Sequence, residues 1–195
     1  IPSISGKEKE VLNVISKNER LSYFGKCYQG EINLSTNKSI ITSTSSEKTK
    51  PLLKGAGIQK WHFPAKMSQG EIEYLLYEQY SKTNSGSKSQ HFKSDRIVMQ
   101  GITGVDEKYR LKATILKAGI FCGHSVNYFS LEGIKSEEAK YILCILNSSV
   151  SNWFFKKFST NSNVNSYEVQ NLPAPKYKES YYVITIVADY LLSCY

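Results

Sequence analysis

The sequence predicts an α/β (α+β) fold, in which a twisted, mainly antiparallel sheet is flanked by helices and carries long surface loops on one face. Three observations support this prediction. Short alternating apolar runs fill residues 96–131, apolar residues at helical spacing mark both ends of the chain, and polar segments separate these elements. With 195 residues and a hydrophobic fraction of 41%, the chain is long enough to bury a substantial core.

The N-terminal part combines one helix with strands. Residues 6–17 place apolar side chains on one face of a short amphipathic helix. Residues 22–42 have aromatic and apolar runs on both sides of a polar centre at residues 35–37, which is typical of a strand-turn-strand hairpin. Residues 51–63 predict a turn followed by a strand that reaches Trp61.

The middle of the chain changes from helix to sheet. Residues 68–80 show helical spacing, whereas residues 81–90 are rich in Ser, Lys, Asn and Gly and predict a surface loop. Alternating apolar residues then predict three antiparallel strands within residues 96–103, 110–119 and 121–131.

The C-terminal part is expected to be mainly helical. Ser136 and the acids after it are typical of a helix start, and the apolar run predicts a helix that continues to Leu146. The prolines of residues 172–175 should end regular structure, and residues 180–194 predict a last helix.

Residues 1–195 are expected to form one functional unit with sublobes at 1–90 and 91–195. Ile1 is preceded by no initiator Met, which suggests a segment excised from a larger protein. No apolar run has the roughly 18 residues that span a bilayer, so no membrane partner is expected. The cysteines are dispersed, which suits reduced thiols in the cytoplasm.

The charge distribution favours an anionic partner. The net charge of +8 comes from 25 basic and 17 acidic residues, and five lysines but no acid lie between residues 48 and 66. Segregation of this kind favours a polyanion, although basic polar loops also keep ordinary proteins in solution.

No catalytic or metal-binding constellation is visible in the sequence. His62, His91 and His124 form no metal-ligand spacing with one another or with the cysteines. The phosphate-binding glycine loops and the nucleophile elbow of hydrolases are absent from the sequence. We therefore expect a binding module with no catalytic residue and no metal site.

Residues 141–175 carry an ordered set of motifs. Leu-Asn-Ser at residues 146–148 is followed by Trp-Phe-Phe at 153–155, by a polar run at 160–165 and by Leu-Pro-Ala-Pro at 172–175. This set resembles the TaqI-like C-terminal specificity domain. That family contains DNA target-recognition domains of type II and IIG restriction-modification adenine methyltransferases, and it is related to type I specificity subunits.

Earlier segments resemble the same family in the same order. Residues 52–61 (LLKGAGIQKW) are similar to a Leu-Lys-Gly element that leads to an aromatic residue, and residues 96–103 (RIVMQGIT) are similar to a strand of the family. Residues 28–37 are similar to its glycine-led recognition hairpin, but they lack the second glycine where the family pattern has it. The resemblance spans nearly the whole chain.

The resemblance implies a non-catalytic domain that recognises a specific double-stranded DNA sequence. N6-adenine methylation with S-adenosylmethionine, and possibly cleavage with Mg²⁺, would belong to methyltransferase and endonuclease domains of the same parent chain. The Asn-Pro-Pro-Tyr motif of those methyltransferases is absent here. This chain itself is expected to bind no cofactor.

Candidate DNA-binding residues are basic or polar and fall at expected loops. Those expected to enter the major groove are Asn33, Ser35, Thr36, Asn37 and Lys38. Those expected to contact phosphates are Lys54, Lys60, Arg96, Lys108, Arg110, Lys156 and Lys157. The alternative function is a protein-interaction or RNA-binding module with a lysine-rich surface.

The aromatic residues before the last two lysines allow two interpretations. Trp153, Phe154 and Phe155 could pack into the core and leave Lys156, Lys157 and the Ser/Thr/Asn run after them exposed beside a phosphate backbone. They could instead form a platform on which RNA bases stack. Core packing is the commoner role and is the one we expect.

Overall fold

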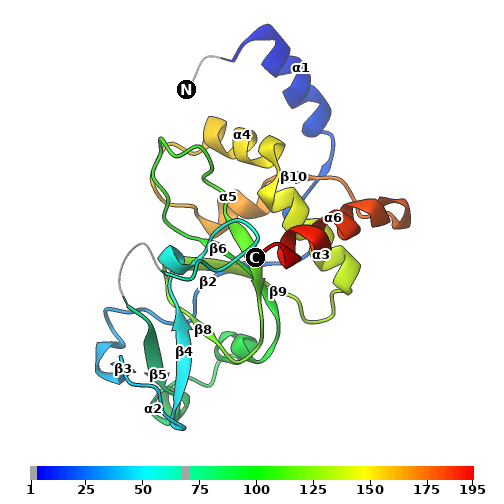
Figure 1. The fold of residues 1–195 in the computed structure, drawn as a ribbon. Helices are drawn as coiled ribbons and strands as arrows, with labels where there is room; N and C mark the ends of the chain where they lie inside the picture. Colours follow the sequence, from blue (N-terminus) through cyan, green and yellow to red (C-terminus); the bar gives the residue numbers. More distant parts are fainter. Residues whose placement is uncertain (1–3, 67–70) are drawn as a thin grey trace.

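The computed structural model describes residues 4–66 and 71–195. The structure contains two four-stranded sheets: the first lies in the middle of the molecule with the C-terminal helices beside it, and the second lies at the other end (Figure 1). Helices and mainly antiparallel strands are both present, which confirms the predicted class.

The first sheet is antiparallel throughout, with the strand order β2-β9-β6-β7. The predicted strand within residues 121–131 is divided between the two sheets, because Gly123 and the residues after it let the chain cross from one sheet to the other. The strands of the first sheet are β2 (Cys27–Gln29), β6 (Arg96–Gln100), β7 (Ala113–Leu116) and β9 (Val126–Ser130).

The second sheet has the order β3-β5-β4-β8, and β8 runs parallel to β4. Because β2 and β3 lie in different sheets, the predicted hairpin over residues 22–42 is wrong: each strand finds its partner far away in the sequence. Each sheet also contains strands from both sides of residue 90, where the boundary between two sublobes was expected. The strands are β3 (Ile41–Thr42), β4 (Thr49–Leu53), β5 (Glu73–Leu76) and β8 (Phe121–Cys122).

Two further local predictions are corrected. The helix expected over residues 68–80 is β5 followed by the short helix α2 (Tyr77–Thr83), because pairing with β3 and β4 buries Leu75; residues 68–70 lie outside the described residues. The strand expected to reach Trp61 does not form: residues 55–57 are a short 3-10 helix, and residues 58–62 are irregular with a bend at Trp61. The loop expected over residues 81–90 includes part of a 3-10 helix, Ser87–Lys93, whose Phe92 is buried.

The two expected C-terminal helices are present, and the structure adds two more. Asn147 does more than end α3, because its side chain accepts a hydrogen bond from the backbone N of Ala113 and donates one to its carbonyl. Ser148 then caps the next helix by accepting from the N–H of Ser151. The helices are α3 (Ser136–Asn147), α4 (Ser149–Phe158), α5 (Ser166–Gln170) and α6 (Tyr182–Ser193).

The predicted N-terminal helix is α1 (Gly6–Ile15), which buries none of its residues and projects from the body of the molecule (Figure 1). A small antiparallel pair follows it, β1 (Glu19–Arg20) with β10 (Pro173–Ala174). Of the prolines expected to stop regular structure, Pro173 therefore lies within a short strand and Pro175 follows it. None of the described helices is long and apolar enough to cross a membrane.

The first sheet is buried on both faces. All five residues of β6 are buried, and successive side chains point to opposite sides. Ile97 and Met99 pack with residues of α3 to α5, whereas Val98 packs with Tyr128 and residues of the second sheet. Phe155 belongs to the same core as Ile97, which confirms the packing expected for it.

A buried ion pair joins the two sheets. The carboxylate of Glu31, just after β2, accepts from Arg96 Nη1 at 2.5 Å and from the backbone N of Cys122 at 2.9 Å. Arg96 Nη2 also donates to the carbonyl of Ile120. Both side chains of the pair are 0% exposed. Burial raises the pKa of Glu31, and the guanidinium of Arg96 opposes that rise.

Neither arginine predicted to contact phosphates is available to do so. Arg96 is held by Glu31, and Arg110 is 1% exposed. Arg110 Nη2 donates to the carbonyls of Asn161 at 2.6 Å and Asn163 at 3.3 Å, while its Nε donates to Thr103 Oγ1 at 3.2 Å. The two guanidinium groups satisfy internal acceptors, which corrects both predictions.

The buried ion pair should control stability. Glu31→Gln leaves the Arg96 charge buried without its counter-ion, and we expect the free energy of unfolding to fall by about 3–5 kcal/mol. Urea denaturation measures the change. The matched control is Glu73→Gln, because Glu73 pairs with Lys54 at 2.8 Å but is partly exposed, and we expect a loss below about 1 kcal/mol. Equal losses for the two variants would contradict this role.

Arg110 should hold the loop of residues 159–163. Arg110→Met keeps much of the packing volume but leaves buried carbonyls without donors, so a loss of about 3 kcal/mol or more is expected. Lys108→Met is the control at an exposed position two residues before Arg110, and its effect should stay within about 0.5 kcal/mol. A small effect of Arg110→Met, with unchanged proteolysis at residues 159–163, would show that the loop does not depend on it.

Candidate nucleic-acid interface

The ends of several strands meet at one edge of the two sheets. Strands β2, β4, β6 and β8 end here, and the chain of residues 123–125 passes between them. Gly30 donates its N–H to Val126, and a Cβ at Gly30 would lie 2.0 Å from the carbonyl oxygen of Gly123. A Cβ at Gly55 would lie 2.4 Å from the oxygen of Ser125. Both positions require glycine because another backbone passes so close.

The loops that follow these strands enclose a polar groove of about 750 Å³. Its walls come from the segments after β4 and β6, from Ser125 before β9 and from the loop after α4. Most of the lining side chains are amides, hydroxyls or charged groups. The lining residues are Lys54, Gly55, Ala56, Gln59, Gln100, Ile102, Thr103, Gly104, Glu107, Lys112, Ser125 and Ser162.

Internal hydrogen bonds fix the groove wall. Gln100 donates to the carbonyl of Ile58 at 2.6 Å, and Thr103 accepts from Arg110. Asn152 of α4 accepts from the backbone N of Arg110 at 2.7 Å and donates to the carbonyl of Lys108 at 2.9 Å. The loops are therefore held before any ligand arrives, which lowers the entropic cost of binding.

A smaller polar hollow of about 200 Å³ borders the groove and shares Ile102 with it. His124, Gln29 and Asn163 line this hollow. His124 Nδ1 accepts from the backbone N of Leu34 at 3.3 Å, so in the neutral ring the proton lies on Nε2. The hollow therefore offers an imidazole donor together with amide groups.

The predicted recognition tip lies next to this hollow, although it is not the tip of a hairpin. Asn33 Oδ1 accepts from the backbone N of Ser35 at 3.0 Å, and Asn37 Nδ2 donates to the Asn33 carbonyl at 2.9 Å. Thr36 also donates to that carbonyl. The side chains of Asn33, Thr36 and Asn37 thus take part in hydrogen bonds that hold the turn, and the exposed residues of the turn are Asn33, Ser35, Thr36 and Lys38.

The predicted lysines are distributed around the groove. Lys54 lines it and pairs with Glu73, while Lys156 Nζ donates at 2.8 Å to the carbonyl of Glu107, another lining residue. Lys108 is exposed in the same loop as Glu107. A hydrogen bond from Lys112 lowers the pKa of Glu107, so this groove carboxylate stays ionised and paired.

Lys157 lies apart from this group. Its ammonium pairs at 2.6 Å with Glu8 of α1, and this hydrogen bond lowers the pKa of Glu8 to about 2. Lys157 is therefore engaged in holding α1. Lys60 lines a separate hollow beside the groove.

Several lining residues were not predicted from the sequence. Gln29, Gln59, Ser162 and Asn163 lie within the motifs of the resemblance but, like His124, were not singled out as DNA-binding residues. A signal was nevertheless present for some of them, because Gln29 and His124 are each beside a glycine at a strand end. Polar residues beside a glycine at a strand end would have indicated the edge of the sheets where the groove forms.

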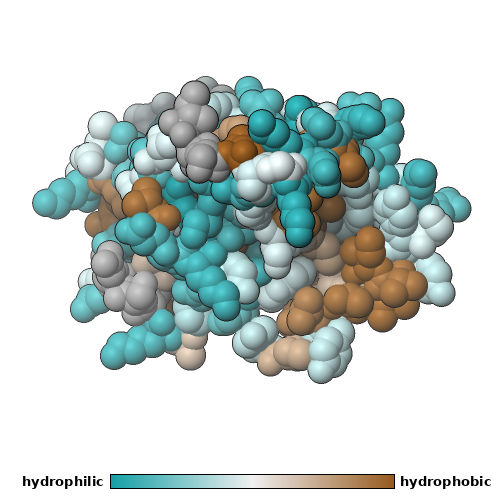
Figure 2. Space-filling model, turned by 90° about the horizontal axis from the view of Figure 1, so that it is seen from above, coloured by the Kyte–Doolittle hydropathy of each residue, from teal (hydrophilic) through white to brown (hydrophobic). Residues whose placement is uncertain are grey.

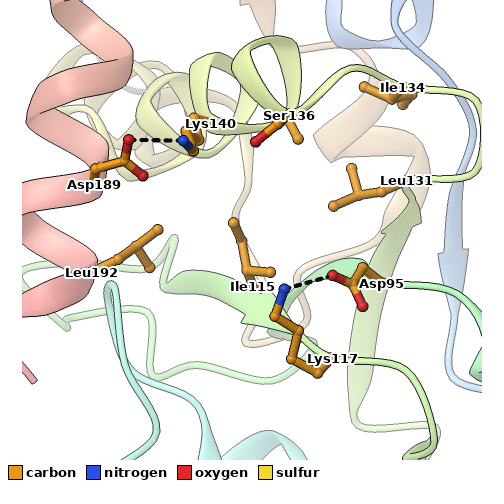
Figure 3. A pocket seen from close by; sticks show the side chains of 10 residues that line it. Asp95, Ile115, Lys117, Leu131, Ile134, Ser136, Lys140, Asp189 and Leu192 are labelled. Atoms are coloured by element: carbon orange, nitrogen blue, oxygen red, sulfur yellow. Dashed lines mark hydrogen bonds and ion pairs between the residues drawn. The ribbon is translucent and has the colours of Figure 1, made fainter.

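A second large hollow, of about 540 Å³, lies at the opposite end of the first sheet (Figure 3). Apolar side chains form much of its wall, and two ion pairs border it, Lys117–Asp95 at 2.8 Å and Lys140–Asp189 at 2.7 Å. The lysines of both sites are paired with carboxylates, but apolar side chains form a larger part of the wall here than in the groove, so this hollow offers fewer polar groups to a polyanion.

Helix α6 presents an apolar face to solvent. Figure 2 shows a continuous brown area on the side of the molecule where α6 lies in Figure 1. The opposite side of α6 packs on α3, where Cys144 Sγ donates to the carbonyl of Ile184. The exposed apolar residues of α6 are Tyr182, Val183, Ile186, Val187 and Tyr190.

The fold resembles that of a known restriction-modification enzyme. The structure of the Type IIL restriction-modification enzyme MmeI in complex with DNA superposes with a TM-score of 0.58 and 9% sequence identity. The superposition covers 88% of this chain and 28% of that one. At this identity the likeness establishes the fold, and this chain spans less than a third of the MmeI chain. No curated protein matches the sequence.

The sequence also matches a family. Residues 50–174 match the family described as the TaqI-like C-terminal specificity domain. This range runs from β4 to β10 and includes most of the groove, whereas the turn of residues 33–37 precedes it. The match covers more than half of the chain, and the chain therefore belongs to the family of TaqI-like C-terminal specificity domains.

Proposed function

We propose that this chain is the DNA target-recognition domain of a restriction-modification enzyme and that its groove holds double-stranded DNA. The observation that carries the proposal is the convergence of polar loops on one groove in a member of the specificity-domain family. The similar MmeI structure, which contains DNA, supports it. The excess of 25 basic over 17 acidic residues favours the same partner.

The side chains divide into two roles. Gln59, Asn163 and the Nε2 donor of His124 can exchange hydrogen bonds with base edges, because amides offer both a donor and an acceptor. The exposed Lys38 and Lys108 are suited to phosphates, which position the duplex without reading it. The internal hydrogen bonds of Gln100 and Thr103 assign these residues to the support of the groove.

The proposal assigns sequence selection, and no reaction, to this chain. N6-adenine methylation with S-adenosylmethionine, and cleavage with Mg²⁺ where it occurs, are assigned to other domains of the parent enzyme. The fact that this chain spans 28% of MmeI is consistent with such a division. Such an enzyme would act in the cytoplasm, on chromosomal or invading DNA.

The apolar face of α6 supports contact with those other domains. Its five exposed apolar side chains form a patch that costs free energy in water. We assign this face to packing against the methyltransferase or endonuclease part of the same parent chain, whereas the groove remains open for DNA.

Selection from a random duplex library tests the proposal directly. At low salt the chain should retain duplexes that share one short motif, and Asn163→Ala or Gln59→Ala should relax the preference at one position by about 1–3 kcal/mol. Sequencing of the retained pool measures both effects. Retention without a motif would contradict sequence reading, and no retention at low salt would favour the protein-interaction alternative. Equal retention of RNA would favour the RNA-binding one.

The salt dependence of duplex binding tests the phosphate contacts. Lys38→Gln and Lys108→Gln should each weaken binding to all sequences and reduce the slope of log K against log salt by about 1. Lys117→Gln is the charge-matched control, because Lys117 is exposed at the far end of the first sheet. If Lys117→Gln reduced the slope of log K against log salt as much as Lys38→Gln and Lys108→Gln do, the DNA would not be bound at the groove.

A further inference from the structure

A hollow of about 380 Å³ beside the groove combines aromatic rings with lysines. Four of its lining side chains are aromatic, and two are lysines. The lining residues are Gln59, Lys60, Trp61, His62, Tyr109, Lys112, Leu191 and Tyr195. Rings together with cations are the combination that binds nucleotides, because the rings stack on the base and the ammonium groups bind the phosphate.

A fixed turn positions two of the rings. Gln59 donates its N–H to the carbonyl of His62 at 3.0 Å, and Trp61 donates its N–H to the carbonyl of Ala113 in β7 at 2.9 Å. Trp61 has φ of 74°, a conformation that costs free energy for a residue with a large side chain. These hydrogen bonds hold residues 59–62 against β7, where the side chains of Trp61 and His62 line the hollow.

The ammonium of Lys60 is available in this hollow. Its Nζ lies 4.2 Å from the centre of the Tyr109 ring, and Lys108 Nζ approaches the same ring at 5.4 Å. Within the described residues, no carboxylate lies at ion-pair distance from Lys60. Burial lowers the pKa of Lys60 because the charged ammonium is partly removed from water. A bound anion would stabilise this ammonium by supplying a counter-charge.

An aromatic ring of the chain already stacks on the ring of His62. Tyr195 stacks on it with 4.0 Å between the ring centres and 16° between the planes. Tyr195 is 75% exposed, so it can be displaced at little cost in packing. A base could adopt the same parallel arrangement.

The hollow adjoins the groove, since Gln59 and Lys112 line both. A nucleotide displaced from a duplex in the groove could reach the rings without leaving the strand. Paired bases are stacked inside the duplex and cannot offer their faces, so only an unpaired base can stack here.

We infer that this hollow binds one unpaired nucleotide of the DNA held in the groove, with the base against the aromatic rings and the phosphate beside Lys60. The inference rests on the proposed function. It assigns to this chain a second contact, with a displaced base, in addition to the reading of paired bases.

The experiment uses Trp61 as the reporter. Trp61 and Trp153 are the two tryptophans of the chain, so Trp153→Phe leaves Trp61 alone. The emission of this variant is followed during titration with a duplex carrying one unpaired adenosine, with the fully paired duplex and with free dAMP. The unpaired-base duplex should quench Trp61 and bind roughly ten-fold more tightly than the paired duplex.

Wall variants then locate the site. Tyr109→Leu and Lys60→Gln should reduce the preference for the unpaired base to less than about two-fold. Tyr182→Leu, an exposed tyrosine on α6, should leave it unchanged. Melting curves identify any variant that fails to fold, and the reporter titration stands without these variants.

The outcomes separate this inference from the proposed function. Equal affinity for the two duplexes, without quenching of Trp61, overturns the inference but leaves duplex binding intact. Quenching by dAMP and not by the unpaired-base duplex also overturns it, since the hollow then takes a free nucleotide. Binding to none of the three probes overturns both proposals.

Discussion

The buried ion pair between Glu31 and Arg96 is the interaction on which the rest of the structure depends. It connects the end of β2 and the start of β6 in the first sheet to Cys122 and Ile120 at β8 in the second. Because both charges are fully buried, each is stable only while the other remains in place. The pair therefore fixes how the two sheets meet, and the meeting of the sheets determines where the loops that form the groove begin.

A second set of buried polar groups holds the loops that begin at the ends of the strands. Arg110 supplies donors to the loop of residues 159–163, while Asn147 and Asn152 attach the helices to the segment of residues 108–113. The polar residues that support the groove are thus distinct from those that remain free at its surface. This division suits the proposed DNA recognition: the supporting network can stay constant while the half-buried Gln59 and the exposed Asn163, which we propose to read bases, vary.

Local patterns predicted the elements whose partners are close in the sequence, and long-range pairing explains the failures. Strands β6, β7 and β9 follow alternating apolar residues, and α3 follows helical spacing. The hairpin over residues 22–42 failed because Cys27 pairs with Phe129 and Ile41 pairs with Leu75. Arg96 and Arg110 were expected at the surface because composition does not reveal a buried partner. The groove lysine Lys54 was predicted, whereas Asn163 was expected only as one member of the exposed polar run of residues 160–165, because nothing in the sequence singled it out before folding brought it beside Gln29 and His124.

Hydrogen exchange of the backbone amides, with and without a duplex carrying the selected motif, tests the central claim most directly. If the groove holds DNA, exchange should slow in residues 29–38, 54–60, 101–112 and 159–166, and it should be unchanged in α6 and around the hollow beside Lys140. Slower exchange confined to α6 or to that hollow, with the groove segments unaffected, would contradict the account and place the DNA on a different face.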